Sequence, residues 1–264
     1  MADLGADGHR RMLKMAVRLD EGIGSRARLG LVVLASDHTI EHEYRRVLSG
    51  IEGVALYESR IHNDPQITPD TLRAMDGLIP ACASVILPGV PLAVVGFGCT
   101  SATMVLGEER IFQRLREGRP EARPTTPITG AFAAFRALGA SRLGVLTPYR
   151  DDVNEMVRNY IEARGFEVPV FGTFDEEDDN RAARISPSSI RDAAIEIGRD
   201  PRVDAVFVSC TSLRTFEVAA ETEAAIGKPL TSSNHAMLWH ALRLAGVQDT
   251  LPQWGRLFGR TIAC

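Results

Sequence analysis

Short runs of apolar residues alternate along the chain with segments whose apolar residues recur at helical spacing. Continuous apolar runs bounded by turn residues are typical of strands that are buried on both faces. They predict strands near residues 29–35, 54–58, 92–98, 143–147, 168–173 and 204–209. Helical spacing predicts helices near residues 39–49, 70–87, 101–117, 151–164, 188–199, 213–226 and 233–245. Because strands alternate with helices, we expect an α/β fold of parallel sheets flanked by helices.

Two sequence patterns occur twice and in the same order. Arg28-Leu29-Gly30 opens an apolar run and returns as Arg142-Leu143-Gly144. Cys99-Thr100-Ser101 ends an apolar run and returns as Cys210-Thr211-Ser212. Repeats in register indicate a duplicated structural unit. We therefore expect two lobes related by a pseudo-twofold axis.

The repeat also predicts how the chain is divided. The first lobe is expected at residues 28–124 and the second at residues 125–231. An N-terminal extension, residues 1–27, precedes them, and a C-terminal helix and tail, residues 232–264, pack back on one lobe. The segment 116–124 is polar and contains two prolines, so it is the predicted linker.

Composition narrows the class of protein further. The 264 residues are 45% hydrophobic and 24% charged, which is average for a globular protein, and the net charge of −4 disfavours a nucleic-acid partner. No stretch is long and apolar enough to span a membrane, and the N-terminus lacks the features of a signal peptide. Four cysteines at irregular spacing favour a reducing compartment. We expect a cytoplasmic protein, and a homo-oligomer remains open.

Cys99 and Cys210 are the candidate reactive groups. Ligands of parallel α/β sheets bind beyond the carboxyl ends of the strands, where both cysteines are expected. Each should precede a helix N-terminus, whose amides stabilise a thiolate and also bind a carboxylate. The alternative is that each Cys-Thr-Ser triplet only ends a strand and caps a helix. Two copies at matched positions favour the functional interpretation.

These features resemble the aspartate/glutamate racemase superfamily, whose two flavodoxin-like lobes each supply one active-site cysteine. The chain is most similar to the branch of maleate isomerase and arylmalonate decarboxylase. The resemblance rests on the two Cys-Thr-Ser triplets, on the Leu146-Thr147-Pro148-Tyr149 turn and on Asn180. Within the branch, Leu34 to Thr39 and Gly255 to Phe258 resemble the isomerase-type proteins of bacterial ectoine-utilisation operons.

The resemblance implies a cofactor-independent isomerase or racemase that acts on a small carboxylate between the lobes, with Cys99 and Cys210 as catalysts. In the isomerase route Cys99 adds to a double bond and Cys210 transfers the proton. The residues that the resemblance implies for substrate binding are Thr100, Ser101, Tyr149, Asn180, Thr211 and Ser212. Asp37 stands where maleate isomerases carry Asn, so we expect it to favour a substrate with an ammonium group.

Two other functions remain open. A two-lobed protein could bind a small molecule without catalysis, and such a binder needs no reactive thiol. Arylmalonate decarboxylases work with the second-lobe cysteine alone, so the presence of Cys99 argues against that route.

Other motifs are given structural interpretations. His38-Thr39-Ile40-Glu41-His42 matches the H-x-x-E-H pattern of zinc peptidases, but it begins at a turn and has no evident third ligand. We therefore expect no metal site, and we expect Glu41, His42 and Glu43 to face solvent. Cys82 is expected to be a buried small hydrophobe. The acidic run 176–179 is expected to be a solvated loop, which the resemblance at Asn180 places near the cleft. No glycine-rich phosphate loop is present.

Overall fold

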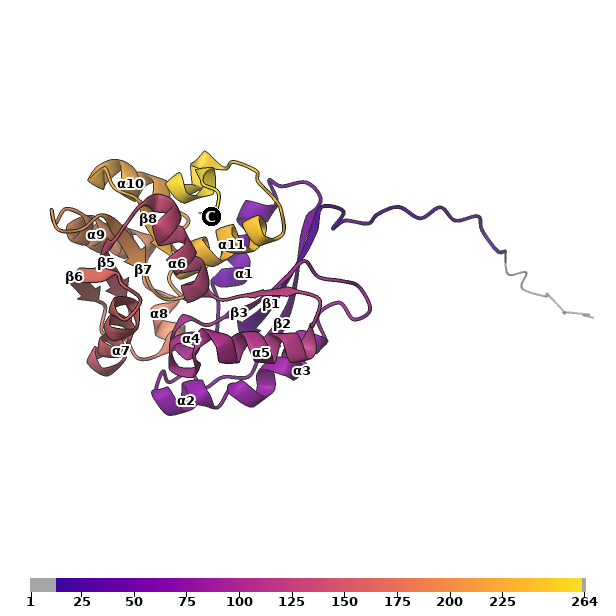
Figure 1. The fold of residues 1–264 in the computed structure, drawn as a ribbon, viewed down its shortest axis with the longest axis horizontal. Coiled ribbons are helices and arrows are strands. Elements are labelled where there is room, and N and C mark those ends of the chain that lie inside the picture. The colour runs from indigo at the N-terminus through magenta and orange to yellow at the C-terminus, as the bar shows by residue number, and fades with distance from the viewer. Residues whose placement is uncertain (1–12, 263–264) are drawn as a thin grey trace, which may run out of the picture.

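Two four-stranded parallel sheets of identical strand order form the framework of the protein. The structure is a computed structural model, and it describes residues 13–262. The first sheet has the order β2-β1-β3-β4 and the second the order β6-β5-β7-β8. Helices surround both sheets (Figure 1). The shared order confirms the predicted α/β fold of two similar parallel-sheet lobes.

The first sheet is built around two strands that are almost entirely buried, β1 and β3. Such strands need continuous apolar sequence, as Leu31 to Leu34 and Val94 to Phe97 provide. The strands of this sheet are β1 (Ala27–Leu34), β2 (Val54–Ile61), β3 (Val94–Gly98) and β4 (Arg123–Thr125). The helices along this part of the chain are α1 (Ile40–Leu48), α2 (Pro69–Arg73), η1 (Asp76–Leu78), α3 (Ile79–Ser84), α4 (Thr100–Leu106) and α5 (Glu108–Gly118).

The second sheet repeats this plan, with β5 and β7 as its buried central strands. Leu143 pairs with Ala205 here, as Leu29 pairs with Val94 in the first sheet. The strands are β5 (Arg142–Thr147), β6 (Glu167–Thr173), β7 (Ala205–Val208) and β8 (Leu230–Ser232). The helices are α6 (Pro127–Leu138), α7 (Asp151–Glu162), α8 (Asp179–Ala182), α9 (Pro187–Gly198), α10 (Ala219–Ile226) and α11 (Ser233–Leu244), and the short η2 (Pro252–Trp254) and η3 (Arg256–Gly259) follow.

Helices α6 and α11 lie side by side in the middle of the molecule (Figure 1). Almost every residue of α11 is buried, because it packs against α6 and also against strands of both sheets. Gly130 of α6 faces the backbone of α11 so closely that an added Cβ would lie 2.7 Å from the carbonyl oxygen of Ala236. A single large core therefore joins the second lobe to part of the first.

Several predicted elements differ from the observed ones. The helix expected at 101–117 is divided at Gly107, whose φ of 88° suits glycine, and the helix expected at 70–87 is three short segments. The helix expected at 213–226 begins only at Ala219. The predicted linker, 116–124, instead contains the end of α5 and the start of β4, so the lobe boundary itself stays a prediction.

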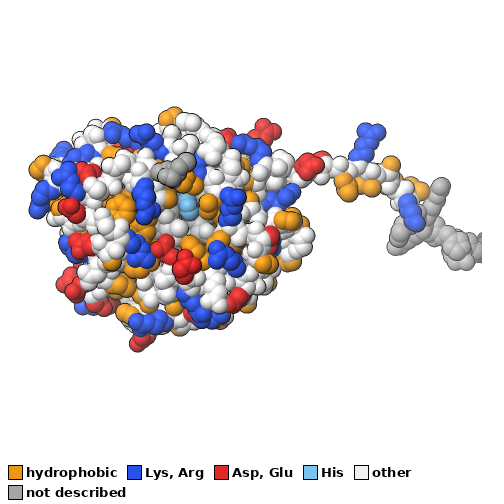
Figure 2. Space-filling model, viewed as in Figure 1, with side chains coloured by type: hydrophobic (Ala, Val, Ile, Leu, Met, Phe, Trp, Pro, Cys, Tyr) orange, Lys and Arg blue, Asp and Glu red, His pale blue; other side chains and the backbone are white. Residues whose placement is uncertain are grey.

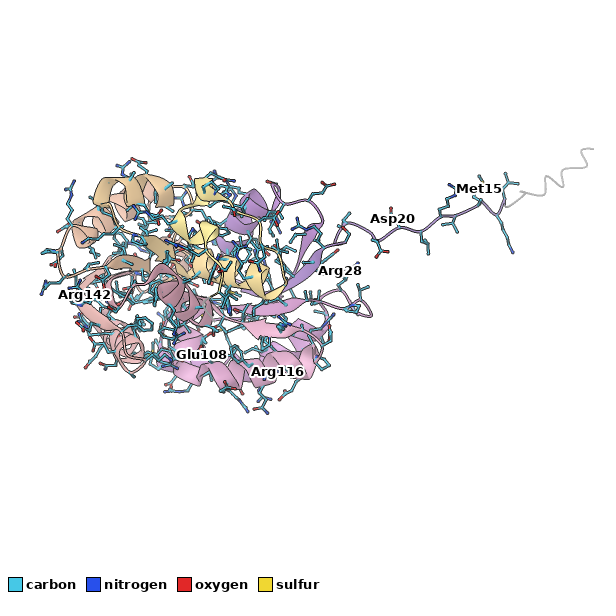
Figure 3. All side chains as sticks on the ribbon, turned by 45° about the horizontal axis from the view of Figure 1, so that its top comes forward. Met15, Asp20, Arg28, Glu108, Arg116 and Arg142 are labelled. Atoms are coloured by element: carbon cyan, nitrogen blue, oxygen red, sulfur yellow. The ribbon has the colours of Figure 1, made fainter. Side chains whose placement is uncertain are left out.

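The described part of the N-terminal extension leads away from the body (Figure 3, Met15 and Asp20), while residues 1–12 of that extension lie outside the described residues. On the face seen in Figure 2, basic and acidic side chains are interspersed and no large patch of one sign appears. Within residues 13–262, no helix is long and apolar enough to cross a membrane.

Candidate active site

A small cavity lies at the carboxyl ends of the central strands of both sheets. Cys99 follows β3 directly, and Cys210 lies two residues beyond β7. The cavity is lined by Leu34, Asn63, Asp64, Gln66, Ile67, Thr71, Leu72, Met75, Cys99, Thr100, Ser101, Tyr149, Asp179, Cys210 and Thr211. Its volume is about 20 Å³, which is enough to hold about one water molecule. The fold thus brings the two predicted cysteines to one enclosed space.

Cys99 is held by the start of a helix. It is the N-cap residue of α4, and its sulfur accepts a hydrogen bond from the Ala102 N–H at 3.4 Å. The Ser101 hydroxyl lies 3.7 Å from the same sulfur. Burial raises the pKa of the Cys99 thiol to about 12, against the effect of these two donors. Cys99 is therefore a neutral thiol near pH 7 in this closed cavity.

Cys210 is held by an irregular turn, which corrects the prediction that a helix begins after each cysteine. The nearest helix, α10, begins at Ala219, and the segment between them contains only turns. The Cys210 sulfur accepts a hydrogen bond from the Ser212 N–H at 3.4 Å. Burial and the nearby Asp179 carboxylate raise the pKa of this thiol to about 12, although the Tyr149 hydroxyl opposes the shift.

Tyr149 lines the same cavity as both cysteines and is buried. Its pKa is raised well above the usual value, first by burial and then by the charge that either cysteine would carry. The tyrosine is therefore a hydroxyl donor throughout the neutral range. Asn154 donates to its carbonyl oxygen at 2.7 Å and so fixes the turn after β5. Thr100 and Thr211, from one triplet each, also border the cavity, and the Thr100 hydroxyl donates to Ser233 at 2.7 Å.

Asp179 lines the cavity, and sequence reasoning missed it. Its carboxylate accepts hydrogen bonds from Ser36 at 2.7 Å and from Ser212 at 3.0 Å. Burial raises its pKa. The run 176–179 was expected to be a solvated loop near the cleft; Asp179 does lie at the cavity, but it is buried and not solvated. The next residue, Asn180, carried the family resemblance, and its closeness was the signal that could have led to Asp179.

Three predicted binding residues lie outside the lining of the cavity. Asn180 forms a hydrogen bond with the exposed His38 at 3.0 Å. Ser212 donates to Asp179, as described above. The Asp37 carboxylate accepts from the backbone N–H groups of Thr39 and Ile40 and thereby fixes the start of α1. Direct binding of substrate by these three side chains stays a prediction.

Asp37 nevertheless acts on the site through its charge. Burial raises the pKa of its carboxyl to about 6, against the opposing effect of the Ile40 and Thr39 N–H groups and the Thr211 hydroxyl. When ionised, it raises the pKa of both Cys99 and Cys210. Above about pH 6, Asp37 therefore adds negative charge to the surroundings of the thiols, next to the Asp179 carboxyl.

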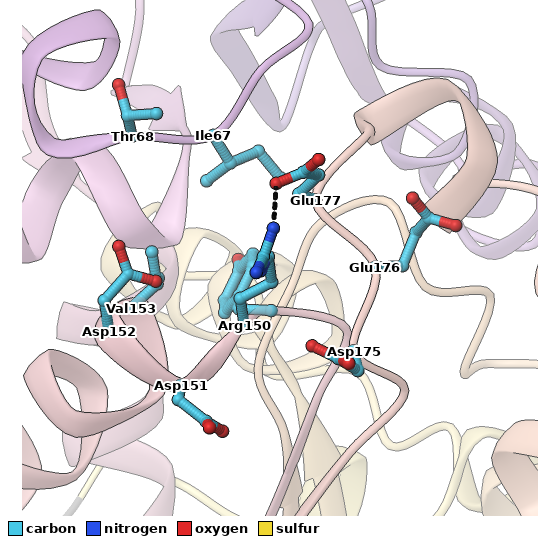
Figure 4. A pocket seen from close by; sticks show the side chains of 10 residues that line it. Ile67, Thr68, Arg150, Asp151, Asp152, Val153, Asp175, Glu176 and Glu177 are labelled. Atoms are coloured by element: carbon cyan, nitrogen blue, oxygen red, sulfur yellow. Dashed lines mark hydrogen bonds and ion pairs between the residues drawn. The ribbon is translucent and has the colours of Figure 1, made fainter.

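A second, more open pocket of about 410 Å³ adjoins the cavity and shares Ile67 and Tyr149 with it. Acidic side chains surround it, and Arg150 forms an ion pair with Glu177 at 2.8 Å (Figure 4). The acidic residues that line it are Asp151, Asp152, Asp175, Glu176 and Glu177. Among residues 13–262, no three His, Cys, Asp or Glu side chains are grouped so that they could hold a metal ion.

The fold and the cavity define a two-lobed α/β protein with one cysteine from each lobe in a shared site. A family model described as arylmalonate decarboxylase matches residues 108–258, which is more than half of the chain. The chain belongs to this family, in the branch that contains maleate isomerases and arylmalonate decarboxylases. The resemblance expected from the sequence is thereby confirmed.

Individual relatives support this assignment. Maleate isomerase from Pseudomonas putida KT2440 is 27% identical over 243 residues, which cover 87% of this chain and 96% of the relative. Arylmalonate decarboxylase from Bordetella bronchiseptica is 31% identical over 136 residues, covering 51% of this chain and 57% of the relative. The finer resemblance to ectoine-utilisation proteins stays a prediction.

Solved structures show the same architecture. A cysteine-to-serine mutant of Nocardia farcinica maleate cis-trans isomerase, with a covalently bound succinylcysteine intermediate, has a TM-score of 0.80 and 26% identity. The match covers 88% of this chain and 98% of that one. A cysteine-to-alanine variant of maleate isomerase from Pseudomonas putida S16 with maleate has a TM-score of 0.79 and 25% identity, over 88% of this chain and 97% of that one.

Proposed function

We propose that the protein is a cofactor-independent cis-trans isomerase of a small unsaturated carboxylate, with Cys99 and Cys210 as its catalytic residues. The observation that carries this proposal is that both thiols line one cavity between the lobes. The succinylcysteine intermediate of the Nocardia farcinica relative supports a covalent route. Free thiols at Cys82, Cys99 and Cys210 fit a reducing compartment such as the cytoplasm.

In this route Cys99 reacts as a thiolate and Cys210 as a thiol. The Cys99 sulfur forms a bond to one carbon of the double bond, and the π electrons take the proton of Cys210 at the other carbon. The remaining single bond rotates. The Cys210 thiolate then removes the proton, the double bond re-forms and the Cys99 thiolate leaves. The step is balanced, because the proton that Cys210 gives is the one it recovers.

Hydroxyl and amide groups around the sulfurs are suited to hold the substrate carboxylates. Tyr149 and Thr211 border the cavity and offer hydroxyl groups, whereas the Thr100 hydroxyl is donated to Ser233 at 2.7 Å. The Ala102 N–H, which points at the Cys99 sulfur, stabilises the thiolate that must form before addition. Burial raises the pKa of Cys99 and so disfavours that thiolate. A four-carbon acid also needs more room than the cavity of about 20 Å³ provides. We therefore propose that the cavity widens when substrate binds and that the thiolate forms in this wider state.

The charge of the cavity favours a substrate that is less anionic than maleate. Its lining contains Asp179 and Asp64 but no Lys, Arg or His. A dicarboxylate would therefore meet negative charge without a cationic partner, whereas an ammonium group on the substrate would be attracted. We propose an unsaturated carboxylate that carries an ammonium group as the preferred substrate.

The function is tested by turnover of a defined panel. The purified protein is incubated with maleate, with an amino-substituted unsaturated acid and with phenylmalonate, and the products are followed by nuclear magnetic resonance. We expect geometric isomerisation without decarboxylation, reduced at least about 100-fold in Cys99→Ser and in Cys210→Ser. Decarboxylation of phenylmalonate, or full activity in either variant, would contradict the proposal. Cys82→Ser is the matched control, since Cys82 lies outside the cavity.

A further inference from the structure

The turn that carries Cys210, in the second lobe, is held by the carboxylate of Glu43, in the first lobe. Glu43 of α1 is fully buried. Its Oε1 atom accepts hydrogen bonds from the backbone N–H groups of Thr215 at 2.7 Å and Phe216 at 2.9 Å. Its Oε2 atom accepts from the side-chain amide of Asn234 at 2.7 Å. All three partners are donors, and they oppose the burial that raises the pKa of Glu43 to about 7. The ionised carboxylate, which prevails above that pH, satisfies all three donors, and an amide in its place could not.

The same contacts continue to the residues next to Cys210. The Asn234 amide that bonds to Glu43 also donates to the carbonyl oxygen of Thr211 at 2.8 Å. Thr39, one turn earlier on the same side of the fold as Glu43, donates to the carbonyl oxygen of Ser212 at 2.8 Å. Both residues that follow Cys210 are thus fixed by groups outside their own segment.

The two cysteines differ in which groups hold their backbone in place. Cys99 is positioned by its own helix, through the Ala102 N–H and through the Thr103 hydroxyl, which donates to the Cys99 carbonyl oxygen at 2.7 Å. No helix follows Cys210 until Ala219, so its turn lacks this internal support. The backbone of such a segment keeps its conformation only if surrounding groups hold it.

From these contacts we infer that Glu43 is a positioning residue of the active site, which holds the Cys210 turn from the first lobe and so keeps the second thiol aligned with Cys99. Glu43 touches neither cysteine, and it acts through Thr215, Phe216 and Asn234. A displacement of about 1 Å at a catalytic group can reduce the rate about 100-fold. Loss of this carboxylate should therefore affect the chemical step more than substrate binding.

The inference rests on the proposed function for its turnover measurement only. We would compare Glu43→Gln with Glu223→Gln. Glu223 is a matched control, because it is also buried and accepts two backbone N–H bonds, from Leu230 and Arg256, but lies apart from the cavity. Glu43→Gln should lower kcat about 10- to 100-fold with KM changed less than about twofold. Glu223→Gln should leave both constants near those of the unaltered protein.

A second measurement needs no substrate. The folded proteins are treated with iodoacetamide, and the alkylation of each cysteine is followed by peptide mass spectrometry. We expect Cys210, which is buried in the intact turn, to react several-fold faster in Glu43→Gln, while Cys99 keeps its rate. Thermal unfolding confirms that each variant is folded. If Glu43→Gln does not fold, Glu43→Asp keeps the charge, withdraws the carboxylate by one methylene and should show the same selective change.

The outcomes separate the inference from the proposed function. Unchanged kcat and unchanged Cys210 alkylation in a folded Glu43 variant would overturn the inference. Equal acceleration at both cysteines, or the same effects in Glu223→Gln, would also overturn it, because they would show a general loss of structure. Absence of turnover in the unaltered protein would instead contradict the proposed function, and the alkylation result would still decide the role of Glu43.

Discussion

At the scale of single residues, Cys99 and Cys210 share their sequence neighbours but differ in support. The repeated Cys-Thr-Ser triplet predicted that both line one cavity, and they do. The triplet could not show that only the first begins a helix, because the support of Cys210 comes from Glu43 and Asn234, far away in sequence. Glu43 was expected to face solvent. Its spacing from Ile40 and Val47 on the buried face of α1 was the signal against that expectation.

Asp37→Asn tests the charge of the site. The change keeps the oxygen that accepts from Thr39 and Ile40, so α1 should hardly respond. Because the pKa of Asp37 is raised to about 6, the negative charge is present only above that pH. At pH 8 we expect the variant to bind maleate more tightly and an amino-substituted acid more weakly, with the difference shrinking towards pH 5. Calorimetric titration measures both, and identical affinities in the two proteins would show that Asp37 serves only as a cap.

At the scale of elements, the long buried strands were predictable and the shortest pieces were not. Continuous apolar runs located β1, β3, β5 and β7 to within a few residues. Strands β4 and β8 have three residues each, too few for any periodic pattern. Helix α6 was missed because alanine, glycine and phenylalanine leave it with little contrast between its faces. Its partner α11 covers it from a distant part of the chain.

Gly130→Ala tests the contact between α6 and α11. Alanine favours helices by about 1 kcal/mol, but here its Cβ would meet the backbone of Ala236 and Met237 at 2.7–2.9 Å. Since backbone cannot move aside cheaply, we expect a net loss of about 1–3 kcal/mol in unfolding free energy, measured in urea. Gly77→Ala is the control, because an added Cβ there meets nothing within 4 Å. If Gly130→Ala were as stable as the unaltered protein, α6 and α11 could move apart to admit the added Cβ without cost, which would contradict this prediction.

His240→Asn tests the burial of α11. Burial lowers the pKa of His240 to about 4, below its ordinary value of 6.5. The unfolded chain therefore binds a proton as the pH falls through 6.5 and the folded protein does not until about pH 4, so stability is lost in this interval. Asparagine can keep the bond that His240 Nδ1 makes with Thr125. Between pH 7.5 and 5 the unaltered protein should lose about 1–2 kcal/mol more than the variant. An equal loss of unfolding free energy in the two proteins between pH 7.5 and 5 would contradict this prediction.

At the scale of the whole molecule, two copies of one strand order place equivalent chain segments at a common site. The first sheet supplies Cys99 and the second supplies Cys210 and Tyr149, each just beyond the carboxyl end of a strand. This arrangement follows from the repeat and could be predicted. The contacts that join the lobes, such as those of Ser36 with Asp179 and Thr39 with Ser212, unite distant residues without any sequence pattern.

The division of work between the lobes is tested most directly by trapping the covalent intermediate. Cys210→Ser protein is incubated with a saturating amino-substituted unsaturated acid and, in parallel, with saturating maleate, and the modified residue is identified by mass spectrometry. In this variant water supplies the proton for the slow addition, and no Cys210 thiolate is present to remove it, so the adduct should accumulate on Cys99 with the added mass of one molecule of the acid. The double variant Cys99→Ser, Cys210→Ser should carry no such adduct. Cys210→Ser protein that remains unmodified at Cys99 by both acids, or a double variant that is modified equally, would contradict the account.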